Sequence, residues 1–502
     1  MAGVAAPIYR NSLRGLGTTA LPTRCAARPI SPRVMGGLRC ASCLSSAAGT
    51  RRPLTAAQLP PTRTRVVVGR ARGFRTDVKV GGSGLEPPPF AFAFDIDGVL
   101  LHVAKPIPGA AEVLRFLNDY NIPFILLTNG GGKHERDRVR DLSEKLGVQL
   151  STDNFVQSHT PFQELLEGPD SLRDKTVLVT GSDYEKCRAI FKEYGFQNVV
   201  TPADIFAADP TIFPFQSASS YPHPSQPLPK PLYNKPTIDR ASLPSHLKID
   251  AIFVLNDPRD WALDTQIITD LLLSHAGYLG TYSPLNGKGN GDNGGGWQQD
   301  GQPRLYFSNA DLLWSAAYHL PRLGQGAFQA ALAGLWRRIT GGAAELRRTS
   351  IGKPFAETYR FAERVLAAHR RGVLRAMGHH VLHYHHHQHR QDPPADLAPD
   401  GGGSGSGSGG GDEGGEVALR RVYMIGDNPE SDIAGANGYA SPEGTEWVPV
   451  LVRTGVWSEG RGGKLEGRFE PRTVADDVTA AVRWALRREG WHRCVTEDGE
   501  LR

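Results

Sequence analysis

Two carboxylates stand two residues apart at the end of an apolar run, in the stretch Phe-Ala-Phe-Asp-Ile-Asp-Gly at residues 92–98. The run is typical of a buried strand, so Asp95 and Asp97 would lie where that strand ends. Carboxylates at a buried position cost free energy unless a positive group meets them. The pair therefore predicts a nearby metal ion or basic side chain. Taken alone it is weak evidence, because most pairs with this spacing are solvated turns or helix caps.

A second apolar run ends in a hydroxyl, an amide and three glycines, in the stretch Leu-Leu-Thr-Asn-Gly-Gly-Gly at residues 126–132. Thr128 and Asn129 close this run, and the glycines begin at Gly130. The N–H groups of a glycine-rich turn before a helix can bind a phosphate. Taken alone, an ordinary turn between a strand and a helix is the simpler interpretation.

Two later stretches add an ammonium and further carboxylates. Lys353 precedes Pro354, and because proline favours the first turn of a helix, the lysine would lie just before a helix start. Taken alone, a surface lysine is the simpler interpretation. Asp427 and Asn428 follow another apolar run that ends in glycine, and Asp432 comes five residues after Asp427. These carboxylates would join the first pair if the two strands were neighbours.

The segments between these stretches alternate between strand and helix patterns. Apolar runs predict strands at residues 90–94, 122–127, 175–180, 251–255 and 421–425. Apolar residues at helical spacing predict helices at residues 109–120, 134–146, 327–339, 354–369 and 474–488. This order favours an α/β fold with a doubly wound parallel sheet, in which ligands bind at the carboxyl ends of the strands.

Low-complexity segments interrupt this pattern. The Pro-rich residues 209–244 and the Gly-rich residues 287–301 are not expected to form regular structure throughout. The His-rich residues 379–389 and the Gly/Ser-rich residues 401–415 predict an exposed loop inserted into a domain, because the alternating pattern resumes at Val417. Histidine clusters can bind transition metals, but this one lacks a defined ligand spacing, so a tolerated loop is the favoured interpretation.

The charge of the chain is unevenly distributed. Residues 1–76 contain 13 Arg and no Lys, Asp or Glu, which leaves 44 basic and 52 acidic residues beyond them. An Arg-rich, acid-free leader is typical of a transit peptide, and we expect a mitochondrial, matrix location; a plastid address and a basic tail without any address are the alternatives. The acidic remainder gives no reason to expect nucleic-acid binding, and no apolar run is long enough to span a bilayer.

The four polar stretches, in this order, resemble the motifs of the haloacid dehalogenase superfamily. The resemblance extends over about residues 90–457 without the inserts, and it is to the class IIA branch, in which an α/β cap lies between the second and third motifs. Further stretches at residues 256–261, 306–314 and 426–438 resemble the mitochondrial subgroup named after cat eye syndrome critical region protein five.

This resemblance implies a division of the chain into a core, a cap, an insert and two terminal segments. The core would comprise residues 88–157, 349–378 and 417–490, with the cap at 158–348, the low-complexity insert at 379–416, the leader at 1–76 and a tail at 491–502.

The resemblance also implies roles for individual residues. Asp95 would be the nucleophile that forms an aspartyl-phosphate, and Asp97 would protonate the leaving group and then activate water. Thr128 and Lys353 would hold the phosphoryl oxygens, together with the phosphate-binding turn at Asn129 and Gly130.

A magnesium ion would complete such a site, since Mg²⁺ prefers one or two carboxylates together with water and substrate oxygens. The resemblance assigns as ligands the carboxylates of Asp95 and Asp427 and the backbone carbonyl of Asp97. Asp432 would bind through water or orient Lys353, and Asn428 would support this loop.

The cap would cover the site and select the substrate. Asp257 and Asn309 are the candidate substrate contacts on the cap. For Trp261 and Trp314 we favour the interpretation that they pack in the interior.

Two functions follow from these expectations. The first is a magnesium-dependent mitochondrial hydrolase, a phosphatase that acts on a small phosphate monoester. The second is a non-catalytic scaffold that binds a phosphorylated metabolite or lipid headgroup, with a link to glycerophospholipid synthesis that rests on the resemblance alone. The sequence specifies no oligomeric state.

Overall fold

The core is a six-stranded parallel sheet in the order β15-β14-β13-β1-β4-β5. The computed structural model describes residues 86–289, 295–314, 316–388, 419–460 and 464–491, all within the unit that runs from Ala71 to Arg502. The predicted leader, residues 389–416 of the insert and all but the first residue of the tail lie outside this description. The strands are β1 (Phe90–Phe94), β4 (Phe124–Thr128), β5 (Phe155–Gln157), β13 (Arg421–Gly426), β14 (Glu446–Val452) and β15 (Thr473–Ala475).

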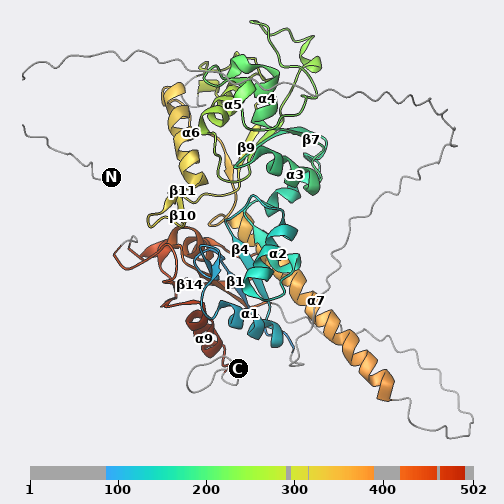
Figure 1. Cartoon of the computed structure of the whole chain (residues 1–502), viewed down its shortest axis with the longest axis vertical. Helices are drawn as coiled ribbons and strands as arrows, with labels where there is room; N and C mark the ends of the chain where they lie inside the picture. The colour runs from blue at the N-terminus through green and yellow to red at the C-terminus, as the bar shows by residue number, and fades with distance from the viewer. Residues whose placement is uncertain (1–85, 290–294, 315, 389–418, 461–463, 492–502) are drawn as a thin grey trace, which may run out of the picture. The chain divides into compact units, whose positions relative to one another are not determined.

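Helices pack on both faces of this sheet, because side chains along each strand alternate between the faces. Phe92 and Phe94 of β1 join a buried cluster with α1 and α9, whereas Ala91 and Ala93 join a second cluster with α7 and α8. Strands from the two ends of the described chain lie in one sheet (Figure 1). The helices are α1 (Ala110–Asp119), α2 (Glu135–Leu146), α7 (Ala356–Gln388), α8 (Ala434–Gly438) and α9 (Val478–Arg488). The doubly wound α/β fold predicted from the sequence is confirmed.

A second parallel sheet, in the order β12-β9-β8-β6-β7, forms the cap. Its strands are β6 (Thr176–Thr180), β7 (Asn198–Val200), β8 (Ala251–Val254), β9 (Arg304–Phe307) and β12 (Thr349–Ser350). Separate buried clusters on its two faces include residues of α3 and α5. Its helices are α3 (Tyr184–Tyr194), α4 (Pro202–Ala208), α5 (Trp261–Leu273) and α6 (Gln325–Ile339).

Two short hairpins project from these sheets. In the core, β2 (Leu101–His102) pairs with β3 (Lys105–Pro106), and in the cap β10 (Leu313–Trp314) pairs with β11 (Arg322–Leu323). The Pro-rich segment contains only the short 3₁₀ turns η3 (Pro210–Ile212) and η4 (Ala218–Ser220), followed by η5 (Leu243–Ser245), as its composition predicts.

The structure corrects two element predictions. The helix expected at residues 354–369 continues as α7 through Gln388, so the first part of the predicted insert loop is helical. From Val373 to Gln388 a single glycine, Gly378, interrupts the helix-forming residues, and no proline stops them.

The helix expected at residues 474–488 begins instead at Val478. Asp477 caps this helix by accepting a hydrogen bond from the Ala480 N–H, and the β-branched Thr473 and Val474 before it pair with β14. In the part of the chain that is described, no helix combines the length and the apolar character needed to cross a membrane.

Candidate active site

Three neighbouring core strands end at one edge, and each delivers a predicted site residue there. Parallel pairing places Phe94 opposite both Ile425 of β13 and Leu126 of β4. Asp95 follows β1, Asp427 follows β13, and Thr128 ends β4. The convergence expected from the sequence is therefore produced by the order of the strands, with β1 between its two partners.

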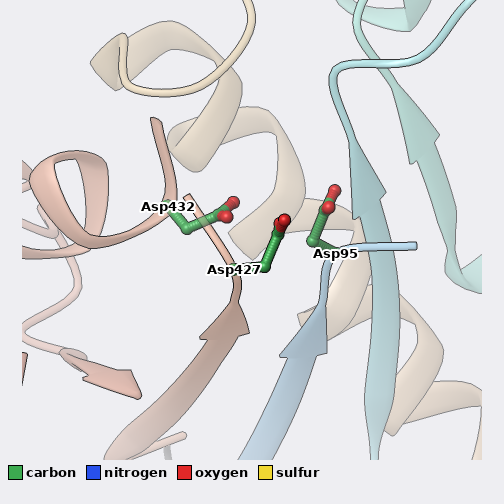
Figure 2. A group of neighbouring side chains, drawn as sticks. All are labelled: Asp95, Asp427 and Asp432. Atoms are coloured by element: carbon green, nitrogen blue, oxygen red, sulfur yellow. The ribbon is translucent and has the colours of Figure 1, made fainter. Parts of the chain in front are cut away.

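Asp95, Asp427 and Asp432 form a buried carboxylate cluster at this edge. Each offers an oxygen atom, and these atoms all lie within 4.8 Å of one another. In Figure 2 the three side chains lie side by side beyond the ends of β1 and β13. Oxygen ligands from two or three carboxylates at this spacing suit a hard divalent cation.

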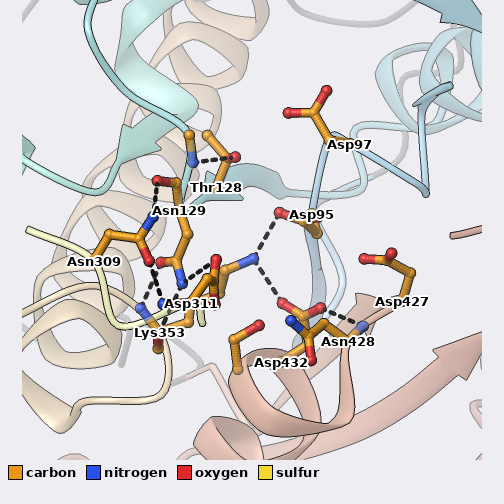
Figure 3. Close-up of polar contacts among 12 residues, drawn as sticks. Asp95, Asp97, Thr128, Asn129, Asn309, Asp311, Lys353, Asp427, Asn428 and Asp432 are labelled. Carbon is orange, nitrogen blue, oxygen red and sulfur yellow. Dashed lines mark hydrogen bonds and ion pairs between the residues drawn. The ribbon is translucent and has the colours of Figure 1, made fainter. Parts of the chain in front are cut away.

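Lys353 supplies a buried ammonium to the cluster. Its Nζ atom lies 2.6 Å from Oδ1 of Asp95 and 2.6 Å from Oδ1 of Asp432 (Figure 3). Burial alone would lower the pKa of Lys353, but the carboxylates of Asp432 and Asp95 outweigh it and raise the pKa. Lys353 therefore stays charged.

The cluster has three carboxylates and one ammonium. With every carboxylate ionised, its net charge would be −2. Burial, and then the negative charge on Asp95, raises the pKa of Asp427. Burial raises the pKa of Asp432 to about 6 in spite of the nearby Lys353 ammonium. A divalent cation would balance this charge, so these residues fit a Mg²⁺ ion.

The turn after β13 holds Asp432 in place. Asp432 lies in η7 (Pro429–Ile433), a single π-helical turn that Asn428 caps through its side chain. The backbone N–H of Asn428 donates to Oδ2 of Asp432 at 3.0 Å. A Cβ atom on Gly426 would lie 2.2 Å from the Asp432 carboxyl carbon, so only glycine lets the turn fold this closely against the strand.

A backbone N–H holds the Asp427 carboxylate, and two glycines leave room for it. The Val456 N–H donates to Oδ2 of Asp427 at 2.5 Å. A Cβ atom on Gly98 would lie 2.4 Å from this oxygen, and one on Gly455 would lie 1.9 Å from it. Gly98 also has a φ of 97°, which favours glycine. The loop after β14 is therefore part of the site, although no polar side-chain pattern in the sequence indicates it.

Asp97 lies apart from the carboxylate cluster. Its side chain is 53% exposed, and Nη2 of Arg138 is 3.7 Å from its Oδ2. In Figure 3 its carboxylate points away from Asp427 and Asp432. The surrounding protein, and then the negative charge on Asp95, raises the pKa of Asp97. A carboxyl group with a raised pKa beside a nucleophile can carry a proton to a leaving group.

The glycine-rich turn after β4 is hydrogen-bonded both to the backbone of Lys353 and to the cap. The hydroxyl of Thr128 accepts a hydrogen bond from the Gly130 N–H at 3.0 Å. Asn129 accepts from the Lys353 N–H at 2.7 Å and donates to the Lys353 carbonyl at 2.9 Å. It also donates to Oδ2 of Asp311 at 3.1 Å, and its backbone carbonyl accepts from Asn309 at 3.1 Å. The Asn129 amide thus positions Lys353 and contacts the cap.

A buried histidine supports this turn from behind. Nε2 of His159 accepts from the Gly132 N–H at 3.4 Å, and Nδ1 lies 2.7 Å from the hydroxyl of Tyr194. That hydroxyl donates to Glu135, which also accepts from Thr160. Burial lowers the pKa of His159 to about 4, so the ring is neutral at pH 7 and one nitrogen can accept. The sequence analysis did not identify this chain of hydrogen bonds.

A cleft of about 300 Å³ opens onto these groups. The core contributes the carboxylates of the site, Thr128, the glycine turn and Lys353, and the cap contributes the opposite wall. Asp432 is buried behind Lys353, and the other predicted site residues line the cleft. The cap residues in the lining are Ser182, Asn256, Asp257, Arg259, Asn309, Asp311, Leu313, Trp314 and Gly324.

The predicted cap residues differ in their environments. Asp257 lines the cleft, burial raises its pKa, and its Oδ1 has no hydrogen-bond partner among the described residues. The side chain of Asn309 is bound to the Asn129 carbonyl. Trp261 packs against Phe328, with ring centroids 5.4 Å apart, so its predicted packing role is confirmed.

The packing role predicted for Trp314 is wrong. Trp314 is 40% exposed and lines the cleft, because it lies on the β10–β11 hairpin rather than under a sheet. Asp311 also lines the cleft, although the sequence analysis gave it no role; burial raises its pKa to about 7 in spite of the Lys353 ammonium. Arg138 was missed as well, although it follows the second motif on α2 and lies beside Asp97.

Two family models match parts of this chain. A family model described as haloacid dehalogenase-like hydrolase matches residues 92–197, and a second, described as HAD-hydrolase-like, matches residues 350–481. A p-nitrophenyl phosphatase from Archaeoglobus fulgidus is similar in structure, with a TM-score of 0.43 and 16% identity over 79% of this chain and 99% of that one.

Two curated relatives are much more similar in sequence. A cardiolipin synthase (CMP-forming) and mitochondrial hydrolase fusion protein of Schizosaccharomyces pombe is 35% identical over 79% of this chain, which spans about half (53%) of the fusion protein. A mitochondrial hydrolase of Saccharomyces cerevisiae is 35% identical over 78% of this chain and 94% of its own length. Two haloacid dehalogenase-like family models match this chain, and the second relative is matched over nearly all of its length. The chain therefore belongs to the haloacid dehalogenase-like hydrolases.

Proposed function

We propose that this protein is a magnesium-dependent phosphatase that hydrolyses a phosphate monoester through an aspartyl-phosphate on Asp95. The observation that carries the proposal is the buried cluster of Asp95, Asp427 and Asp432, with oxygen atoms within 4.8 Å of one another and an ammonium 2.6 Å from two of them. A nucleophile, a basic group for the phosphoryl oxygens and a place for a divalent cation thus meet at one end of one cleft.

The chemistry needs two proton transfers. The Asp95 carboxylate attacks phosphorus and forms an acyl phosphate while the bond to the leaving oxygen breaks, and Asp97 gives that oxygen its proton. Asp97 then takes a proton from the water that attacks the acyl phosphate, which releases phosphate and restores Asp95. The raised pKa of Asp97, to which the charge of Asp95 contributes, supports this role.

Lys353 and Thr128 would hold the phosphoryl oxygens. The Thr128 hydroxyl oxygen already accepts from Gly130, which leaves its proton for the substrate. The carboxylates of Asp95 and Asp427 and the backbone carbonyl of Asp97 would hold Mg²⁺, whereas Asp432 positions Lys353. When bound, Mg²⁺ draws the phosphoryl oxygens toward Asp95 and screens the repulsion between them.

We also propose a mitochondrial location. The acid-free, Arg-rich composition of residues 1–76 supports it, as do the names of both relatives. The fusion of one relative to a cardiolipin synthase supports a role beside phospholipid synthesis.

The test is the release of phosphate from p-nitrophenyl phosphate by the full chain with Mg²⁺. We expect Asp95→Asn to abolish turnover, because an amide is a poor nucleophile. Asp476→Asn, which changes an exposed aspartate paired with Arg453, is the control and should leave the rate unchanged. Equal rates for Asp95→Asn and the unmodified chain would remove Asp95 from the mechanism.

A second measurement separates catalysis from the scaffold alternative. Beryllium fluoride with Mg²⁺ mimics an aspartyl-phosphate, so it should raise the Tm of the unmodified chain and not that of Asp95→Asn. Binding of glycerophosphate without turnover of any phosphate ester, and without this Tm increase, would favour the scaffold.

A further inference from the structure

Two large apolar side chains form part of the cap wall of the active-site cleft. Leu313 and Trp314 of β10 line the cleft, and each is 40% exposed. The same cleft also holds the carboxylates and Lys353. A small, fully polar phosphate ester would leave these two side chains without an apolar partner.

The apolar surface continues along the hairpin beyond the cleft. Six of the thirteen large hydrophobic side chains that are markedly exposed in the described residues lie between positions 312 and 323. Scattered exposed hydrophobic residues are normal, but a concentration of this kind marks a binding surface. The six are Leu312, Leu313, Trp314, Tyr318, Leu320 and Leu323. We call this set the apolar hairpin surface.

The hairpin is fixed relative to the catalytic end of the cleft. The N–H groups of Gly324 and Gly326 donate at 2.9 Å to the carbonyls of Leu312 and Asp311, respectively. Asp311 in turn accepts a hydrogen bond from Asn129, the residue that follows Thr128. Leu313 and Trp314 are therefore held in a fixed position beside the phosphate-binding turn.

We propose that the substrate is an amphiphilic phosphate monoester whose alkyl or acyl chain leaves the cleft along the apolar hairpin surface. The inference rests on the proposed phosphatase function and adds the substrate class. The cleft of about 300 Å³ has room for the phosphate and the atoms next to it. The rest of a longer molecule must pass the cap wall, where Leu313 and Trp314 can bury its methylene groups.

Continuity with the cleft favours a substrate chain over a second copy of this protein as the occupant. Leu313 and Trp314 belong to the lining of the cleft and to the apolar hairpin surface at once. The guanidinium of Arg322 lies 4.5 Å from the ring centroid of Tyr318, so a cation also stands on this surface. An apolar chain that begins at a phosphate would occupy both the cleft and the apolar hairpin surface.

The test is a series of n-alkylphosphonates from ethyl to decyl, which cannot be hydrolysed, bound to the full chain with Mg²⁺ and measured by calorimetry. We expect the affinity to rise with chain length by about fourfold for each methylene that the hairpin buries. The kcat/KM values for the matching n-alkyl phosphates should rise in parallel, while kcat stays nearly constant.

Matched variants locate the effect. Leu313→Ala and Trp314→Ala should lower the affinity for decylphosphonate far more than that for ethylphosphonate, and so flatten the dependence on chain length. Leu335→Ala is the control, because Leu335 has almost the same exposure, 39%, on α6 away from this cleft. Leu335→Ala should keep the full dependence of affinity on chain length.

The outcomes separate the two proposals. Turnover without any dependence on chain length would overturn the proposal of an amphiphilic substrate and leave the proposed phosphatase function unchallenged. Phosphonate binding that strengthens with chain length, with no turnover of any ester, would overturn the phosphatase and support the amphiphilic ligand. A dimer in sedimentation that dissociates in Leu313→Ala and Trp314→Ala, with the chain-length dependence kept, would assign the surface to a second copy and overturn the inference.

Discussion

At the scale of single residues, Lys353 shows how strongly the site depends on paired charges. Its side chain is almost fully buried, with 2% of it exposed, and it contacts the carboxylates of Asp95 and Asp432. Removal of one partner from a buried ion pair leaves an uncompensated charge in a poorly solvated place. The stability of the core and the proposed chemistry of the cleft therefore depend on the same ammonium.

We expect Lys353→Met to lower the free energy of unfolding by about 3–5 kcal/mol, because it leaves Asp95 and Asp432 buried without their cation. Urea denaturation without Mg²⁺ would measure this loss. The double variant Lys353→Met with Asp432→Asn should recover part of it. Lys145→Met, which removes a more exposed pair with Asp141, should cost no more than about 1 kcal/mol. Equal losses for the two single variants would contradict the importance of the buried pair.

The sequence predicted single site residues well where their side chains define a motif. Asp95, Thr128, Lys353 and Asp427 meet as expected, because parallel strands end at a shared edge. The N–H of Val456, which binds Asp427, could not be predicted, since a backbone donor leaves no residue type to recognise.

At the scale of elements, a buried carboxyl group joins three parts of the cap. Asp264 of α5 accepts a hydrogen bond from Thr180 of β6 at 2.6 Å and one from Tyr184 of α3 at 3.0 Å. Its other oxygen has no hydrogen-bond partner in the described part of the chain. Burial raises its pKa to about 8, so the folded protein holds this group neutral at pH 7.

This raised pKa makes the stability of the cap dependent on pH. Between about pH 4 and pH 8 the folded state keeps a proton on Asp264 that the unfolded state loses, so this group lowers stability as the pH rises through that range. We expect Asp264→Asn, which is neutral at every pH, to reduce the fall in Tm between pH 5 and pH 9. Asp476→Asn at the surface should not change that fall. An unaltered fall in Asp264→Asn would show that Asp264 is ionised in the folded state.

Helices and strands were predictable where their own sequence pattern determines them. They were less predictable where pairing with another part of the chain determines them. The five predicted strands are all present, because each is a short apolar run. The change from β15 to α9 was missed, since Thr473 and Val474 become a strand only by pairing with β14. The hairpin that carries Trp314 was missed for a similar reason: its side chains face the cleft only because Asp311 and Gly324 fix its base.

At the scale of the whole molecule, the carboxylate cluster joins parts of the chain that are far apart in sequence. Asp95 comes early in the described chain and Asp427 comes near its end, yet β1 and β13 are adjacent. A cation held between them binds the folded state and not the unfolded one. By mass action, an ion at a hundred times its Kd stabilises the folded state by about 2.7 kcal/mol.

We therefore expect Mg²⁺ to raise the Tm by several degrees. Gly455→Ala should raise the Mg²⁺ concentration needed for half of this effect by about 10- to 100-fold, because a Cβ atom there would displace Asp427. Gly438→Ala, where a Cβ atom meets nothing within 4 Å, is the control and should behave like the unmodified chain. The same Mg²⁺ requirement in both variants would exclude Asp427 as a ligand.

The position of β1 between β4 and β13 also has a consequence for how the protein is made. Asp95 leaves the ribosome more than three hundred residues before Asp427 and the loop at Gly455 that secures it. A nascent chain that includes Asp95 but has not yet reached Arg421 holds the proposed nucleophile and lacks the neighbouring strand β13. Synthesis must therefore pass Gly455 before the site can assemble, and termination between Asp95 and Arg421 leaves Asp95 without the carboxylates that it meets in the folded protein.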